Sequence, residues 1–196
     1  MAAVAVPMSS KTALMAACEY GDASDLLSAL SAATPHSNGR NSDVDARDSQ
    51  GRTAAMYAAS AGNANAFKLL RRGPSLLNIA DNDGGTPAMS CAVHGHTQAL
   101  IELIARGADV SHNAVDNDGW TAMHYACGKG EPAIVKLLLD SNSKHGTGAV
   151  DGVTQMLQAR NHDGMTPLDL AKENNNDECL RAIRVHVEEV QRNKDN

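Results

Sequence analysis

The residues best suited to chemistry in this sequence are its four cysteines and eight histidines. Thiolate and imidazole groups bind zinc, and structural zinc sites usually place paired ligands about two to four residues apart. The cysteines form no C-x-x-C pair, and the histidines form no H-x-x-x-H pair. The nearest approach to a ligand pair is His94-Gly-His96, and no C-x-x-C or H-x-x-x-H pair accompanies it. The sequence therefore predicts no metal site.

Catalysis would require a different constellation, such as a nucleophile beside a base or a loop that holds phosphate. The sequence contains no G-x-x-x-x-G-K-[ST] loop, no G-x-S-x-G motif and no H-E-x-x-H motif. Its aspartates recur at regular intervals, which indicates a repeated structural role rather than a catalytic pair. We therefore predict no catalytic residue, no cofactor and no enzyme activity.

The charge and composition limit the classes of partner. The net charge is −6 at pH 7, and a general nucleic-acid binder needs a basic face, so we expect no nucleic-acid partner. No apolar run is long enough to cross a bilayer, so we expect no membrane partner, and the N-terminus lacks the pattern of a signal peptide. Cysteines without a secretory signal are typical of a reducing compartment. We expect the cytoplasm, with the nucleus as the alternative.

The elements that would position any site form an internal repeat. A threonine followed nine residues later by glycine, or by asparagine in the last copy, occurs in segments 12–21, 53–62, 86–95, 121–130 and 166–175. A turn of the form Asp/Asn-x-x-Gly precedes the last four copies, at 48–51, 81–84, 116–119 and 161–164. Apolar residues follow at helical spacing, so each unit predicts a turn and two short helices. We expect the threonine to cap the first helix and the glycine, as at Gly21 and Gly62, to make a left-handed turn between the helices.

This unit resembles the ankyrin repeat, whose signature T-P-L-H-x-A belongs to a unit of about 33 residues. The likeness is clearest at Thr86-Pro87 and at Thr121, which His124 and Ala126 follow in the signature positions. The resemblance implies a mainly α fold, an ankyrin-repeat α-solenoid of about five repeats in which β-turn loops join paired antiparallel helices. We predict a flexible lead-in at 1–10, a repeat domain at 11–190 and a polar tail at 191–196, with repeats near 11–47, 48–80, 81–115, 116–160 and 161–190.

Two insertions break the period. The marker threonines are separated by 41, 33, 35 and 45 residues, so the first and last intervals are the longest. The extra residues fall around 34–41 and 141–152, where polar residues and glycine predict loops. Long loops in such folds either make specific contacts or are tolerated excursions, and the sequence leaves both readings open.

The resemblance also implies where a partner binds. In ankyrin proteins the turn tips and the exposed ends of the first helices line a concave surface that generally binds other proteins. Carried over by position, the candidate partner-binding residues are Tyr20, Arg52, Asp83, His94, Asp118, Trp120, Lys129 and Met165. Trp120 is the only tryptophan, and tryptophan is enriched among the residues that dominate binding energy. Either it anchors a partner or it packs over its own turn.

These features predict a non-catalytic protein–protein interaction module, an adaptor or scaffold that we expect to be a monomer. It would bind a partner protein through the concave surface. The alternative is a regulatory or targeting subunit of a larger enzyme complex whose activity lies in the partner. Both use the same surface, so the sequence does not separate them.

Overall fold

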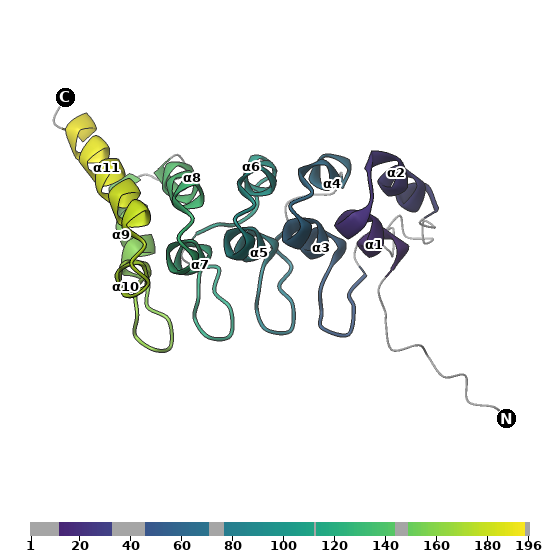
Figure 1. Ribbon diagram of the computed structural model, residues 1–196, viewed down its shortest axis with the longest axis horizontal. Coiled ribbons are helices and arrows are strands. Elements are labelled where there is room, and N and C mark those ends of the chain that lie inside the picture. The colour runs from purple at the N-terminus through teal and green to yellow at the C-terminus, as the bar shows by residue number, and fades with distance from the viewer. Residues whose placement is uncertain (1–11, 33–45, 71–76, 112, 144–148, 195–196) are drawn as a thin grey trace.

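The computed structural model describes residues 12–32, 46–70, 77–111, 113–143 and 149–194. Within these ranges the chain forms helices and no strand. The helices are α1 Ala13–Tyr20, α2 Ala23–Ala32, α3 Ala54–Ala61, α4 Ala64–Leu69, α5 Pro87–His94, α6 Thr97–Ala105, α7 Ala122–Lys129, α8 Pro132–Ser143, α9 Ala149–Gln158, α10 Pro167–Glu173 and α11 Asp177–Lys194. All of these except α9 form two rows (Figure 1). The predicted class, a mainly α solenoid of stacked helix pairs, is confirmed.

The inner row consists of α1, α3, α5, α7 and α10, and the turns project from it; the outer row consists of α2, α4, α6, α8 and α11. Each inner helix contacts the next inner helix, and each outer helix contacts the next outer helix. Small residues such as Ala58, Ala92 and Ala126 are fully buried on the inner helices, so these helices can approach closely. One cluster of buried apolar residues runs through the whole stack, as expected where no repeat can bury its apolar face alone.

Each turn is held by the side chain of its first residue. The Oδ1 of Asp81 accepts hydrogen bonds from the backbone N–H groups of Asp83 at 3.0 Å and Gly85 at 2.8 Å. The same pair of bonds is made by Asp48, Asp116 and Asn161. The turn glycine has a positive φ, +77° at Gly119, which side-chain-bearing residues rarely adopt. The recurrence of aspartate and glycine is therefore explained by the turn itself.

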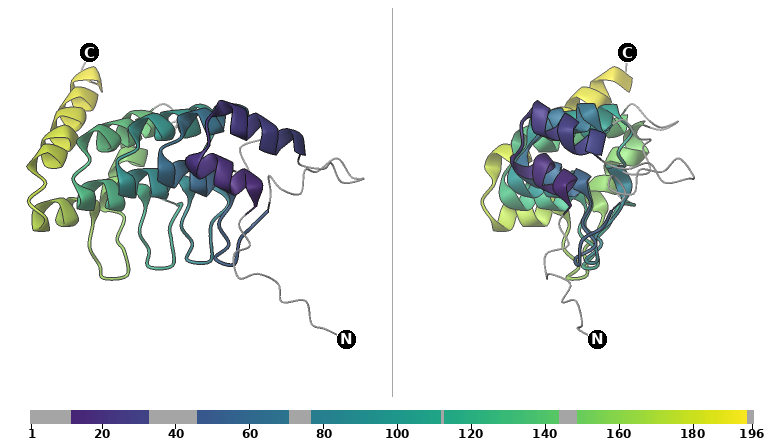
Figure 2. Two further views of the ribbon diagram at one scale, coloured as in Figure 1. Left: turned by 45° about the vertical axis from the view of Figure 1, so that its right-hand side comes forward. Right: turned by 90° about the vertical axis from the view of Figure 1, so that its right-hand side faces the viewer.

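Neighbouring turns are bonded to one another. A backbone N–H of each turn donates to a carbonyl of the turn before it, from Asn82 to Gln50 at 3.0 Å, from Asn117 to Asp83 at 2.9 Å and from His162 to Asp118 at 2.9 Å. Seen along the stack, the turns lie one behind another (Figure 2). We call this connected set of turns the turn ladder.

Threonine begins each inner helix, as predicted. The hydroxyl oxygen accepts a hydrogen bond from the N–H three residues further on at Thr12, Thr86, Thr121 and Thr166. Thr53 makes no such bond, and within the described part of the chain its buried hydroxyl has no hydrogen-bond partner. Four of the five predicted caps are therefore present.

The prediction of a left-handed glycine between the helices of a pair is confirmed at Gly62, Gly95 and Gly130, with φ values of +70°, +74° and +78°. It is wrong at Gly21, whose φ is −82° and ψ 152°. Here the side chain of Asp22 accepts the N–H groups of Ser24 and Asp25, so Asp22 caps the start of α2 directly after the extended Gly21. Asn175, the asparagine that replaces the last glycine, has a φ of +57° and does form the left-handed turn.

The described parts of the second insertion are helical, so the prediction of a loop there is wrong, and residues 144–148 lie outside the described ranges. Residues 141–143 belong to the end of α8, and residues 149–152 to the start of α9. Helix α9 packs on α8 and buries Val153, Met156 and Leu157. The predicted loop at 34–41 and the lead-in at 1–10 lie outside the described residues. Helix α11 extends to Lys194, into the segment predicted as a tail, and the predicted domain boundaries stay predictions.

Candidate functional site

Four residues occupy the same place in successive turns, directly after the turn glycine, and we call them the post-turn row: Arg52, Gly85, Trp120 and Met165. The backbone N–H of each donates to the side-chain oxygen of the first residue of its turn. The four side chains therefore start from equivalent backbone positions. They share no chemistry, although the Asp or Asn and the glycine of each turn repeat, so neighbouring repeats differ in this row.

Arg52 is held by its own repeat. Its Nε donates to the Oδ2 of Asp48 at 2.9 Å, its Nη2 donates to the Tyr57 hydroxyl at 2.7 Å, and its guanidinium carbon lies 4.7 Å from the centre of the Tyr57 ring. The Tyr57 hydroxyl donates to the same Asp48 oxygen at 2.8 Å. Burial, followed by the bond to Asp48, raises the pKa of Tyr57 to about 12. The arginine predicted to bind a partner is thus part of an Asp–Arg–Tyr set within one repeat.

Trp120 is partly buried and packs on its own repeat. Its ring centre lies 5.0 Å from that of Tyr125 and 6.0 Å from that of His124. Its Cζ3 lies 3.8 Å from the position that a Cβ on Gly128 would take. The Tyr125 hydroxyl donates to the Oδ2 of Asp116 at 2.5 Å, and burial followed by this bond raises the pKa of Tyr125 well above its usual range. Trp120 therefore packs over its repeat, and whether its exposed remainder anchors a partner stays a prediction.

The third repeat departs from this arrangement. Gly85 stands where its neighbours have Arg52 and Trp120, and Ser90 stands where they have Tyr57 and Tyr125. A hollow of about 170 Å³ lies there, which we call the third-repeat hollow. Its lining includes the apolar side chains of Met56, Met89 and Val93 together with Arg52, Asp81, His94 and Tyr125. Three successive repeats thus contribute to one depression beside the post-turn row.

The two predicted tip residues, Asp83 and Asp118, lie exposed at the ends of their turns. Their carbonyl groups accept the bonds of the turn ladder, so their backbones are fixed while their carboxylates face solvent. Together with Asp81 and Asp116 they make the middle turns acidic. No basic residue stands in either turn, 81–84 or 116–119.

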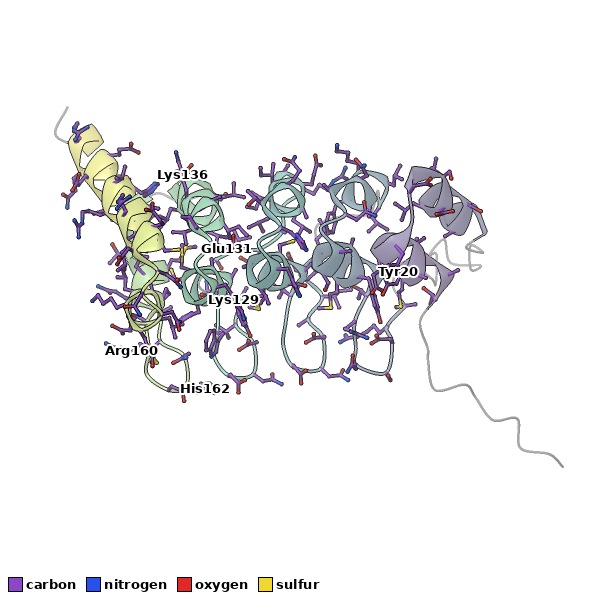
Figure 3. All side chains as sticks on the ribbon, viewed as in Figure 1. Tyr20, Lys129, Glu131, Lys136, Arg160 and His162 are labelled. Carbon is purple, nitrogen blue, oxygen red and sulfur yellow. The ribbon has the colours of Figure 1, made fainter. Side chains whose placement is uncertain are left out.

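The three predicted helix-end residues lie at the ends of α1, α5 and α7. Tyr20 is 80% exposed, and Figure 3 shows Tyr20 and Lys129 on inner helices at separate places along the stack. The Nδ1 of His94 donates to the Ser90 carbonyl at 2.8 Å, and its ring stacks on that of His96 with centres 5.8 Å apart. Of the eight candidates, the hollow brings together Arg52 and His94.

The four cysteines and His124, which could in principle take part in chemistry, have structural roles. Burial raises the pKa of all four cysteines, and it lowers that of His124, whose Nδ1 accepts the N–H of Thr121 at 3.1 Å. The proton of His124 is therefore on Nε2, which donates to the Met165 carbonyl at 3.1 Å and so joins the fourth repeat to the fifth turn. Among the described residues no group of three His, Cys, Asp or Glu side chains could hold a metal ion. The helices in the same ranges include none with the length and apolar character to span a bilayer.

Sequence reasoning missed the hollow itself. Gly85 stands directly after the turn, but the matching loss of bulk at Ser90 lies five residues further on and on a different element. Aligning the repeats and asking which one lacks both bulky side chains would have found it. The signal is a difference between repeats rather than a motif.

The comparisons agree with this architecture. The ankyrin-repeat family, described as three copies, matches residues 4–77, 73–147 and 111–194. The chain therefore belongs to the ankyrin-repeat family. Ankyrin repeats are generally protein–protein interaction modules and typically non-catalytic.

Similar proteins include the B-cell lymphoma 3 protein of Homo sapiens, 32% identical over 61% of this chain and 24% of that protein. The tyrosine-protein kinase HTK16 of Hydra vulgaris is 29% identical over 66% of this chain and 16% of its own length. Inversin of Gallus gallus is 29% identical over 62% of this chain and 10% of its own length. The chain thus spans less than a third of each of these relatives, and the similarity supports the repeat fold rather than any one relative's activity.

Proposed function

We propose that this chain binds a partner protein through the concave surface formed by the post-turn row, the turn ladder and the exposed ends of the inner helices, and that it does not itself catalyse a reaction. The observation that carries the proposal is the post-turn row. Its four members hold equivalent backbone positions but differ in chemistry, while the Asp or Asn that holds each turn, the turn glycine and the threonine at the start of each inner helix recur. Different side chains at equivalent positions are what a specific recognition surface on a repeated scaffold requires.

The energetic contributions along this surface are unequal. Trp120 is large, held against Tyr125 and only partly buried, so a partner could cover the rest of it at little cost in side-chain entropy. Tyr20 is more exposed but lies in the first repeat, and Met165 lies in the fifth. We expect Trp120 and the third-repeat hollow to dominate affinity, and the acidic tips Asp83 and Asp118 to affect the rate of association more than its strength.

Two forms of this function remain, a stand-alone adaptor and a regulatory or targeting subunit whose enzymatic activity lies in the partner. We expect a monomer in the cytoplasm or nucleus, with no nucleic-acid partner. These expectations rest on composition and family, and a partner of known activity would distinguish the two forms.

The test is quantitative affinity capture from the native cell with the wild-type chain and Trp120→Ala. The matched control is Ile101→Ala, an exposed apolar residue of α6 in the outer row, 39% accessible. If the proposal is correct, Trp120→Ala reduces recovery of a stoichiometric partner by about thirtyfold, a typical hot-spot loss of about 2 kcal/mol. Ile101→Ala should leave recovery unchanged, and equal recovery with all three proteins counts against the concave surface. An activity assay on the captured complex then separates adaptor from regulatory subunit.

A further inference from the structure

The third-repeat hollow contains an incomplete version of a set of side chains that its neighbours complete. In the second repeat, Asp48 Oδ2 accepts hydrogen bonds from both Arg52 and Tyr57. In the fourth, Asp116 Oδ2 accepts one from Tyr125. In the third, the Oδ1 of Asp81 holds the turn as usual, but no donor within the described ranges is bonded to its Oδ2. The hollow therefore presents a carboxylate oxygen without the donors that its counterparts have.

The walls of the hollow suit one long side chain. Its volume of about 170 Å³ is close to that of a cavity that holds a single benzene-sized ring, about 150 Å³. Met56, Met89 and Val93 offer apolar surface to a methylene stem, while Asp81 and Tyr125 offer a carboxylate and an aromatic ring. A folded element is too large for this space, and a short polar side chain leaves its apolar lining uncovered.

The negative charge near the hollow favours a positively charged side chain as its occupant. Asp81 lines the hollow, and the negative charges of Asp116, Asp118 and Asp81 all act on Tyr125, which lines it as well. The one arginine in the lining, Arg52, is already bonded to Asp48. The net field at the hollow is therefore negative, which favours a basic side chain over tyrosine or an aliphatic one.

We propose that the third-repeat hollow binds an arginine of a basic partner segment, whose guanidinium bonds to Asp81 and stacks on Tyr125. The second repeat provides a precedent, since Arg52 bonds to Asp48 and lies over the ring of Tyr57. The third repeat lacks both the arginine and the tyrosine of this set, so the partner would supply the arginine and Tyr125 of the fourth repeat would supply the ring. A planar guanidinium suits this carboxylate and ring better than the compact ammonium of lysine. The inference rests on the proposed function and names the partner's chemistry.

Three variants isolate the hollow. Asp81→Asn removes the charge but should keep the turn, because Asn161 holds the fifth turn through the same two bonds. Asp83→Asn removes the same charge from the exposed tip and measures the long-range electrostatic effect alone. Ser90→Tyr fills the hollow with the residue found at positions 57 and 125, and its hydroxyl can bond to Asp81 as theirs do to Asp48 and Asp116. Circular dichroism melting curves establish that each variant is folded.

The probe is a display library of random linear peptides selected on the full chain, with the enriched peptides then measured by fluorescence anisotropy. We expect the enriched peptides to share an arginine, whose replacement by lysine weakens binding and by alanine abolishes it. Asp81→Asn should lower affinity about tenfold to hundredfold, as for loss of a hydrogen bond to a charged group, while Asp83→Asn lowers it less than about threefold. Ser90→Tyr should abolish binding.

The outcomes separate this inference from the proposed function. Peptides that lack a shared arginine and bind Asp81→Asn and Ser90→Tyr normally, but lose binding to Trp120→Ala, overturn the hollow and leave the concave surface standing. Peptides that bind all of these variants equally overturn both. A failure of the library to enrich any peptide over an empty support counts against the hollow as a site for a linear segment.

Discussion

Replacing Gly128 by alanine should stabilise the protein, although Gly128 lies beneath the only tryptophan. Gly128 belongs to α7, and a Cβ at this position would meet Trp120 Cζ3 at 3.8 Å and atoms of Asn174 and Leu170 at 4.0 Å. These are ordinary van der Waals separations, so the methyl group fits without displacing Trp120. Glycine within a helix costs about 1 kcal/mol relative to alanine, less near a helix end, and the partly buried methyl adds a few tenths. The expected gain is about 1 kcal/mol.

The matched control is Gly130→Ala, two residues further on. Gly130 has a φ of +78°, and a Cβ there would lie 2.7 Å from Asn176 Oδ1. Alanine at this position is strained in the backbone and crowded in space, so it should destabilise the protein by about 1 kcal/mol or more. The two substitutions make the same chemical change and differ only in backbone conformation and surroundings.

Urea denaturation measures both effects. Circular dichroism reports the unfolding of the whole stack, and the fluorescence of Trp120 reports that of the fourth repeat. A gain of about 1 kcal/mol corresponds to a rise of about 2–4 °C in Tm for a chain of this size. Loss of stability in Gly128→Ala would refute the placement of Trp120 across Gly128, because only a close contact that the geometry does not contain could reverse the helix preference. A gain in Gly130→Ala would refute the left-handed turn.

Three further predictions concern the scaffold. Thr53→Val should change the free energy of unfolding by less than about 0.5 kcal/mol, because the buried Thr53 hydroxyl has no partner in the described structure. Thr86→Val removes a helix cap and should lower the free energy of unfolding by about 1 kcal/mol. Equal losses for the two variants in urea denaturation would contradict this difference. Burial holds the pKa of His124 below its ordinary 6.5, so its stabilising contribution is complete above pH 6.5 and falls by at most about 1.4 kcal/mol per pH unit below it. The His124→Asn variant should lack that part of the slope, and an unchanged slope would show that other groups cause it. Asn176→Ala removes two bonds from its Nδ2 to carbonyls at the end of α7, at 2.8 and 3.1 Å, and should lower stability by about 1–2 kcal/mol; unchanged stability would mean that these bonds contribute nothing net.

The local rules of the repeat could be predicted from the sequence because each acts within a few residues. The Asp81 side chain reaches only as far as Gly85, and the Thr86 hydroxyl only as far as Met89, so spacing alone indicates both bonds. The conformation of Gly21 could not be inferred by analogy, because Asp22 provides another way to begin the next helix. Repeat position thus predicts a conformation only where the flanking residues repeat as well.

Features that depend on several repeats were harder to predict. Helix α9 has an apolar pattern in Val153, Met156 and Leu157, but the glycines before it favoured a loop, and its apolar face becomes useful only against α8. The candidate residues lie on the turns and helix ends, and their part in binding stays a prediction. The hollow arises from side chains that are missing in the third repeat and present in the repeats before and after it. No window of sequence within a single repeat contains that information.

The turn ladder has a consequence for the thermodynamics of association. Because each turn is bonded to the turn before it, the tips around Asp83 and Asp118 are already ordered before any partner arrives. The conformational entropy lost on binding therefore falls mainly on the partner, and a flexible basic segment would lose most of it. Partners already rigid and extended, with contact residues at the spacing of successive turns, should bind more tightly than flexible peptides of the same composition. The distance between successive turns therefore selects partners by the spacing of their side chains as well as by the charge of those side chains.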